Sequence, residues 1–207
     1  MYSFSHAIQD YVIRISDIII ATLLLILLAP FFLIIAIFIK LDSSGEVFFK
    51  QERVGKDGEI FMMYKFRSMC NNADKMSHKF RRNDSGVTEP VIKRKNDSRV
   101  TRIGRFLRKY SIDELPQLFN VVMGHMSLVG PRPPVLIEEK LYTDSQRERL
   151  KVKPGLTGLA QIANRSDLSF DQIIELDKHF IDNRSIILYY KIIFLTIPFL
   201  FSAKGAY

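Results

Sequence analysis

The stretch IIIATLLLILLAPFFLIIAIFI, residues 18–39, decides the fold, because it carries no charge and has Thr22 as its one strong hydrogen-bonding side chain. About 20 apolar residues are the length of a membrane-embedded helix. Pro30 lies near the middle of this stretch. A proline inside a helix removes a backbone donor and clashes with the carbonyl group four residues earlier, here that of Ile26. We therefore expect a membrane helix that kinks or breaks at Ala29-Pro30.

Two topologies are open for this helix. Each half is about 15–18 Å long at ~1.5 Å per residue, which is shorter than the ~30 Å hydrocarbon core. The stretch is therefore either one kinked span or a re-entrant hairpin whose two ends leave by the same membrane face. Physics alone favours the span, because proline is tolerated in spanning helices. The excess of lysine and arginine after the helix places the rest of the chain in the cytoplasm.

Charge and composition narrow the function classes. The chain has 207 residues, and 30 Lys and Arg against 22 Asp and Glu give a net charge of +8, which suits an anionic partner such as lipid headgroups or nucleotide phosphates. No nucleic-acid recognition motif is present, and the membrane helix argues against that partner. The single cysteine, Cys70, excludes an internal disulfide. We expect two parts: a lead-in and membrane helix at 1–40, and a membrane-apposed cytoplasmic catalytic domain at 41–207.

The remaining pattern predicts an α+β, mainly helical fold. Two β-prone runs, 47–49 and 60–64, flank a Gly/Asp turn and predict a small β-hairpin. Amphipathic or charged helices are expected at 99–109, 135–150 and 170–180, and an interfacial helix at 186–201. The polar segment 71–96 has no clear period and predicts an exposed insertion.

Asp113-Glu114 is the outstanding pair of acidic residues. We expect it in the first turn of a helix that Ser111 caps. Neighbouring carboxylates on a helix do not face each other. They suit a division of labour, in which one carboxylate is a nucleophile and the other holds a hard cation such as Mg²⁺. The alternative is structural, because acidic residues in a first turn also interact favourably with the helix dipole.

Basic residues surround this pair in the sequence and point to phosphate chemistry. Arginine presents a planar fork that matches phosphate oxygens, and a flanking proline on each side would hold one such fork in place. Each of these cations taken singly could also be an ordinary surface charge. No phosphate-binding glycine loop and no metal-binding histidine spacing is present. The basic residues are Lys65, Arg67, Arg105, Arg108, Lys109 and Arg132.

Three long segments resemble the bacterial sugar transferases called monotopic phosphoglycosyl transferases: FFKQERVGKDGEIFMMYKFRSM (48–69), DSRVTRIGRFLRKYSIDELPQLFNVVMGHMSLVGPRP (97–133) and VKPGLTGLAQI (152–162). The resemblance implies transfer of a sugar-1-phosphate from a UDP-sugar to undecaprenyl phosphate, with release of UMP. It implies Mg²⁺, a covalent phosphosugar enzyme, and a place on the cytoplasmic face of the bacterial inner membrane, against its anionic lipid bilayer. The reaction would initiate glycoconjugate assembly.

The same resemblance assigns roles to particular residues. Asp113 is the implied nucleophile and Glu114 the implied Mg²⁺ ligand. The implied substrate-binding residues are Lys65, Arg67, Arg108, Pro131, Arg132, Pro133, Gln161 and Arg165. The membrane element becomes a re-entrant hairpin broken at Ala29-Pro30, which replaces the kinked span as the expectation.

The chain departs from the family pattern at two places. Ala29 stands where a serine is usual before the proline, and Tyr189 stands where the pattern of 185–191 has an aspartate. If that aspartate helps to build the site, either Asp177 or another group must substitute for it, or the activity is reduced. A different class of function also stays open, namely a non-catalytic membrane-surface scaffold of a polysaccharide assembly complex. The sugar, the pathway and the oligomeric state, including a homo-oligomer, are not specified by the sequence.

Overall fold

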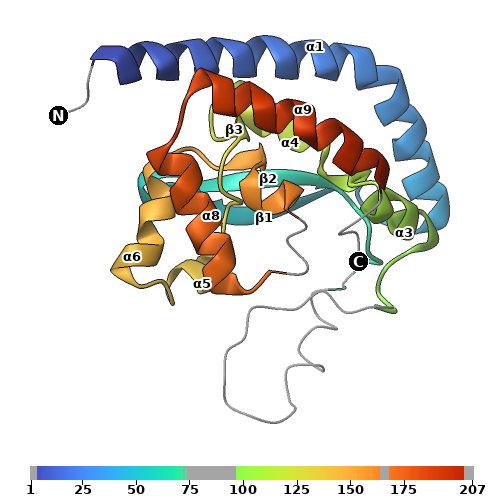
Figure 1. The fold of residues 1–207 in the computed structure, drawn as a ribbon. Coiled ribbons are helices and arrows are strands. Elements are labelled where there is room, and N and C mark those ends of the chain that lie inside the picture. Colours follow the sequence, from blue (N-terminus) through green and yellow to red (C-terminus); the bar gives the residue numbers. More distant parts are fainter. Residues whose placement is uncertain (1–3, 72, 74–96, 164–167, 203–207) are drawn as a thin grey trace.

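The computed structural model describes residues 4–71, 73, 97–163 and 168–202, which form a mainly helical α+β fold (Figure 1). Most of the expected insertion at 71–96, and Arg165, lie outside the described residues. In chain order the elements are α1 (Phe4–Asp42), β1 (Phe48–Val54), η1 (Lys56–Gly58), β2 (Ile60–Phe66), α3 (Arg102–Lys109), η3 (Ile112–Glu114), α4 (Gln117–Met123), β3 (Ser127–Val129), α5 (Leu136–Glu139), α6 (Asp144–Arg147), η4 (Glu148–Lys151), β4 (Gly155–Thr157), α7 (Leu159–Ile162), α8 (Phe170–Asp182) and α9 (Ile186–Ser202).

Helix α1 is one continuous helix of 39 residues that stays helical across Pro30. Its section Ala7–Asp42 is long and apolar enough to cross a membrane, by length and composition. Figure 1 shows α1 running across the top of the molecule and then bending downward along its side. The interruption expected at Ala29-Pro30 is not shown, and the re-entrant path stays a prediction.

The two parts of α1 pack against different parts of the domain. Before the proline, Ile13 and Ala21 are buried in the cluster that contains β3, α4 and α9. After it, Ile35 and Ile39 are buried in a second cluster with Phe66. The rest of the helix surface exposes large apolar side chains, among them Leu23, Ile26, Leu27, Leu33, Ile37, Phe38 and Leu41. An apolar surface of this size marks contact with a membrane or a partner.

Strands β1 and β2 form the predicted hairpin, in antiparallel register from Phe48↔Phe66 to Val54↔Ile60. The short 3-10 helix η1 makes its tip. Helix α4 is fixed to the hairpin by the buried side chain of Asn120. Its Nδ2 donates to the Met62 carbonyl oxygen at 2.7 Å, and its Oδ1 accepts from the Tyr64 amide at 3.1 Å. Asn120 thereby pairs with backbone groups at the edge of β2.

Strands β3 and β4 pair in parallel, Ser127↔Gly155 and Val129↔Thr157, and the sequence did not predict them. The two backbones approach closely just after β3. A Cβ atom on Gly155 would lie 2.0 Å from the backbone nitrogen of Gly130, so glycine is required there. This pairing places the loop after β3, residues 130–134, beside the start of β4.

Of the helices predicted at 99–109, 135–150, 170–180 and 186–201, three are confirmed as α3, α8 and α9. The single helix predicted at 135–150 is wrong, because the segment contains α5, α6 and η4. Thr143 is the reason for one of these divisions. Its hydroxyl oxygen accepts from the amide of Gln146, whose side chain bonds back to the Thr143 amide, and this capping box begins a new helix.

Candidate active site

Asp113 and Glu114 lie on the 3-10 helix η3, between α3 and α4. Ser111 has left-handed backbone angles (φ 55°, ψ 21°) and makes no side-chain cap, so the predicted Ser111 cap is wrong. The left-handed residue turns the chain sharply after α3. Asp113 is buried at 8% exposure, yet it lines a cavity, as does Glu114.

Two of the predicted cations contact Glu114. Lys65, near the end of β2, places its Nζ 2.5 Å from Glu114 Oε1. Arg132 places Nη1 3.8 Å from the same oxygen. The structure thus brings together residues from the hairpin, from η3 and from the loop after β3. Because these ion pairs are only partly exposed, solvent screens them less than surface pairs.

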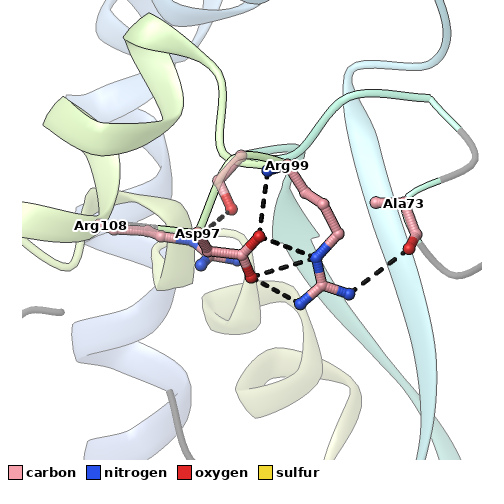
Figure 2. A network of polar contacts seen from close by, with 5 residues as sticks. Ala73, Asp97, Arg99 and Arg108 are labelled. Atoms are coloured by element: carbon pink, nitrogen blue, oxygen red, sulfur yellow. Dashed lines mark hydrogen bonds and ion pairs between the residues drawn. The ribbon is translucent and has the colours of Figure 1, made fainter. Parts of the chain in front are cut away.

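Arg108 enters the site from the last turn of α3. Its Nε donates to the Ser68 hydroxyl at 2.8 Å, which fixes the plane of the guanidinium (Figure 2). Burial lowers the pKa of Arg108, while the negative charges of Asp113 and Asp97 act in the opposite direction. Arg108 is therefore a cation that Ser68 orients near the carboxylate of Asp113.

Figure 2 also shows an ion pair beside Arg108, between Asp97 and Arg99. Arg99 Nη2 lies 2.5 Å from Asp97 Oδ2, and its Nη1 donates to the Ala73 carbonyl oxygen at 3.4 Å. The hydrogen bonds from Arg99 hold the pKa of Asp97 down at about 2. Through Arg99, residues 97–99, which precede α3, are thus held against Ala73.

Arg67 contacts the end of α1 as well as the cavity. Its Nη2 donates to the carbonyl oxygen and hydroxyl of Ser43, at 2.6 and 3.0 Å, and to the Ile39 carbonyl oxygen at 3.4 Å. These acceptors lie at the C-terminal end of α1, where a cation interacts favourably with the helix dipole. Arg67 lines the cavity, but its guanidinium also ties the membrane helix to the end of β2.

The proline-rich loop is held rigidly by backbone contacts. The Gly155 amide donates to the Pro131 carbonyl oxygen at 2.8 Å, and the Val54 amide donates to that of Pro134 at 3.1 Å. Pro131 and Pro133 are both buried, whereas the Arg132 side chain between them is partly exposed. The loop therefore presents Arg132 to the cavity in one orientation.

The cavity measures about 820 Å³, and its wall is both charged and apolar. Charged residues of the wall include Arg53, Lys65, Arg67, Asp97, Arg99, Arg108, Asp113, Glu114 and Arg132, and the polar residues include Gln161. The apolar residues of the wall include some from the two most apolar helices, namely Ile20 and Leu24 of α1 and Ile193, Ile197 and Phe199 of α9. Gln161 Oε1 is buried and accepts no hydrogen bond from the described residues.

The acidic residues of the cavity fit a magnesium ion only if the substrate supplies the remaining ligands. Among the described residues no group of three or more His, Cys, Asp or Glu side chains comes together. Mg²⁺ is commonly bound through one or two carboxylates, with water and substrate phosphates as the other ligands. Asp113 and Glu114, both on the cavity wall, meet that requirement.

Sequence reasoning missed several residues of this site. Ser68 orients Arg108, and Arg53 is a buried arginine of the cavity wall. Neither belongs to a recognisable local motif, although both lie inside the segment 48–69. The expectation that Asp177 could substitute at the site has no geometric support, since Asp177 is buried against Arg149 at 2.5 Å.

Tyr189, the other departure from the pattern, is fully buried. Its hydroxyl donates to Asp17 Oδ1 at 2.7 Å. It joins α9 to α1 and does not line the cavity.

Comparison with known proteins places the chain in a family. The sequence pattern of the family described as bacterial sugar transferase matches residues 8–203. The exopolysaccharide production protein ExoY of Sinorhizobium fredii is 40% identical over 194 residues, which cover 92% of this chain and 86% of that protein. A UDP-glucose:undecaprenyl-phosphate glucose-1-phosphate transferase of Klebsiella pneumoniae is 44% identical over 202 residues. An undecaprenyl-phosphate galactose phosphotransferase of Salmonella typhimurium is 39% identical over 198 residues. The last two matches each cover 94% of this chain but only 41% of the longer relative.

Proposed function

The chain belongs to the bacterial sugar transferase family and is a phosphoglycosyl transferase, and from this premise we propose that it transfers a sugar-1-phosphate from a UDP-sugar to undecaprenyl phosphate, releasing UMP. One observation carries the proposal. A single cavity is lined by Asp113 and its cations and also by apolar residues of α1 and α9. A reaction between a water-soluble nucleotide and a lipid phosphate needs both kinds of surface in one place.

The transfer takes place in two displacements. An oxygen of the Asp113 carboxylate attacks the sugar-side phosphorus, the bond from phosphorus to the bridging oxygen breaks, and UMP leaves with that oxygen. The sugar phosphate is then bound covalently to Asp113 as an acyl phosphate. An oxygen of undecaprenyl phosphate attacks the same phosphorus, the acyl phosphate bond breaks, and the Asp113 carboxylate is restored. Dividing one transfer into two steps is the usual advantage of a nucleophilic residue.

The neighbouring cations neutralise the phosphates during both displacements. Phosphoryl transfer depends almost entirely on positioning and on charge stabilisation. Arg108, held by Ser68, faces the attacked phosphate, and Arg132, held by the proline-rich loop, faces the phosphate beside it. Lys65 holds the Glu114 carboxylate at 2.5 Å and keeps it oriented toward the substrate. Glu114 would also hold Mg²⁺, which when bound supplies further positive charge to the diphosphate.

The Asp113→Asn variant tests this function. We expect UMP release from a UDP-sugar in the presence of undecaprenyl phosphate and Mg²⁺ to fall by at least about 10³-fold, because the amide is no nucleophile. The matched control is Asp57→Asn, which makes the same change at the exposed tip of the hairpin. Full activity of Asp113→Asn would overturn the assignment of the nucleophile. The scaffold alternative predicts no turnover with any nucleotide sugar and an unaffected cellular function in Asp113→Asn. A panel of UDP-sugars in the same assay identifies the sugar.

A re-entrant path for α1 is part of the proposal, with the domain on the cytoplasmic face of the inner membrane. The support is that α1 contacts the same domain with both of its parts. Arg14 donates to the Val121 and Val122 carbonyl oxygens of α4 at 2.6 and 2.9 Å. At the other end, the Ile103 amide of α3 donates to Asp42 Oδ2 at 2.9 Å. A straight span could not touch one cytoplasmic domain with both ends.

Labelling tests this path. A cysteine introduced by Ser5→Cys in a Cys70→Ser background should react with a membrane-impermeant reagent only from the cytoplasmic side. Reaction only from the periplasm would overturn the re-entrant path without affecting the assignment of Asp113.

A further inference from the structure

Arg53, at the end of β1, is a buried arginine of the cavity wall that the proposed reaction has not yet used. It is 7% exposed. Its Nη1 donates to the Pro133 carbonyl oxygen at 3.0 Å, and its Nη2 donates to Gln51 Oε1 at 2.7 Å. Its Nε is buried and has no hydrogen-bond partner in the described part of the chain. The guanidinium is thus fixed in the wall of the cavity with one donor unused.

The charge of Arg53 is not compensated by an acidic neighbour. Within the described residues, Arg53 forms no ion pair, and Glu138 and Glu114 act on it only from a longer distance. The similarly buried Arg149, by contrast, lies 2.5 Å from the carboxylate of Asp177. Removing a charge from water is costly unless an opposite charge accompanies it. The uncompensated cation therefore indicates an anion that is bound only during the reaction.

Arg132 strengthens this indication, because it is a second guanidinium close to the first. Burial and then repulsion by Arg132 lower the pKa of Arg53 to about 10. The contact of Arg53 with the Pro133 carbonyl oxygen places it directly against the loop that carries Arg132. Two like charges held together beside a cavity form a site for a doubly charged anion, and paired arginines match the oxygens of a phosphate.

This inference rests on the proposed function. We propose that Arg53 and Arg132 together bind a phosphate monoester that lies opposite Asp113, on the other side of the transferred phosphorus. In phosphoryl transfer the attacking and leaving oxygens are roughly in line. When Asp113 attacks, the UMP phosphate leaves opposite to it. When Asp113 is later displaced, the lipid phosphate must approach from that same side. One arginine pair therefore stabilises the UMP phosphate as it leaves and then holds the lipid phosphate as it attacks.

Equilibrium binding of UMP and of uridine to the full chain in nanodiscs tests the site without turnover. The ratio of the uridine Kd to the UMP Kd measures the contribution of the phosphate. A hydrogen bond to a charged group corresponds to roughly a 10- to 100-fold effect. We expect that ratio to fall by about this factor in Arg53→Gln and by less in Arg53→Lys. Lys56→Gln removes the same charge from the exposed tip of the same hairpin and should leave the ratio unchanged.

The outcomes separate the two proposals. If the wild-type chain binds UMP no better than uridine, the proposed nucleotide chemistry is wrong. If the wild-type chain shows the phosphate effect and Arg53→Gln keeps it, the assignment of Arg53 is wrong. A purely structural Arg53 would lower Tm and leave the ratio unchanged. If Arg53→Gln does not fold, Arg53→Lys decides alone, because it retains a cation and a donor for the Pro133 carbonyl oxygen but loses the fork.

A second binding experiment tests the lipid substrate. It compares undecaprenyl phosphate with undecaprenol, which lacks the phosphate. Competition of each lipid against bound UMP gives its affinity in wild-type and variant chains. We expect the advantage of undecaprenyl phosphate over undecaprenol to decrease in Arg53→Gln in parallel with the UMP ratio. A loss confined to UMP would refute the shared use of the site and restrict Arg53 to the leaving nucleotide.

Discussion

Tyr189→Phe is the perturbation that best isolates how the membrane helix is attached to the domain. Asp17, on α1, is 1% exposed, and its Oδ1 accepts three hydrogen bonds. They come from Tyr189 of α9 at 2.7 Å, from the Leu128 amide of β3 at 2.7 Å, and from the Ser127 hydroxyl at 3.1 Å. Removing one phenol hydroxyl deletes one of the three bonds and leaves the ring to fill its space.

The expected loss of stability in Tyr189→Phe follows from the negative charge of the acceptor, the Asp17 carboxylate. A hydrogen bond to an ionised group contributes about 1.5–3 kcal/mol, whereas one between neutral groups contributes about 0.5–1.5 kcal/mol. For a chain of this size the first range corresponds to a decrease in Tm of roughly 3–12 °C. Tyr190→Phe is the matched control. The neighbouring Tyr190 hydroxyl pairs with the neutral Ser16 hydroxyl at 2.7 Å, so its loss should cost less.

Circular dichroism at a fixed scan rate in nanodiscs measures both variants, because the chain has no tryptophan to report unfolding by fluorescence. Asp17→Ala should lower Tm further than Tyr189→Phe, since it leaves the buried Leu128 amide and two hydroxyls without their acceptor. An equal Tm for Tyr189→Phe and Tyr190→Phe would refute the reasoning. It would mean that the carboxylate of Asp17 does not carry the attachment.

Three further predictions concern the site and its support. Ser68→Ala should lower kcat for UMP release by roughly 10-fold while Tm changes little, because Arg108 loses the acceptor that orients it, and Ser68→Thr should restore the rate. Because the hydrogen bonds from Arg99 lower the pKa of Asp97 to about 2, Asp97 stabilises the fold above pH 4 and loses that contribution as the pH falls toward 2. Asp97→Asn should therefore flatten the dependence of Tm on pH in that window, and an unchanged acid limb would contradict the ion pair. Gly155→Ala should destabilise the fold by about 3 kcal/mol or more, since its Cβ would meet a backbone nitrogen at 2.0 Å, and a wild-type melting curve would show that β4 can move away from β3.

The parts of the fold that sequence predicted are those set by local patterns. The alternating runs around a Gly/Asp turn predicted the β1–β2 hairpin, and apolar periodicity predicted α3, α8 and α9. The Asp113-Glu114 pair and its basic neighbours could be selected as candidates because Lys65, Arg108 and Arg132 all lie in recognisable segments. Their convergence on one cavity is a property of the tertiary structure, which supplies the distances.

The parts that sequence did not predict depend on long-range contacts or on a local override. Strands β3 and β4 have three residues each and pair across an interval of almost 30 positions, so neither has a periodic signal of its own. Ser111 has the composition of a helix cap, but the chain turns there in a left-handed conformation and the side chain caps nothing. Arg53 looks like any charge of an exposed hairpin, and only the packing of the proline-rich loop against β1 makes it a buried cation.

Helix α1 is part of the active-site architecture as well as a membrane element. Its Arg14 binds the carbonyl oxygens at the C-terminal end of α4, the helix that follows Asp113 and Glu114. Its Asp17 binds β3, which continues into the proline-rich loop, and its C-terminal end accepts the hydrogen bonds of Arg67 after β2. The helix α4, the strand β3 and the end of β2, which all lie beside the cavity, are therefore connected to α1 by polar contacts. Because these contacts are partly or fully buried, the proposed function implies that the depth of α1 in the bilayer sets the depth of Asp113, and with it the height at which a lipid phosphate would be attacked.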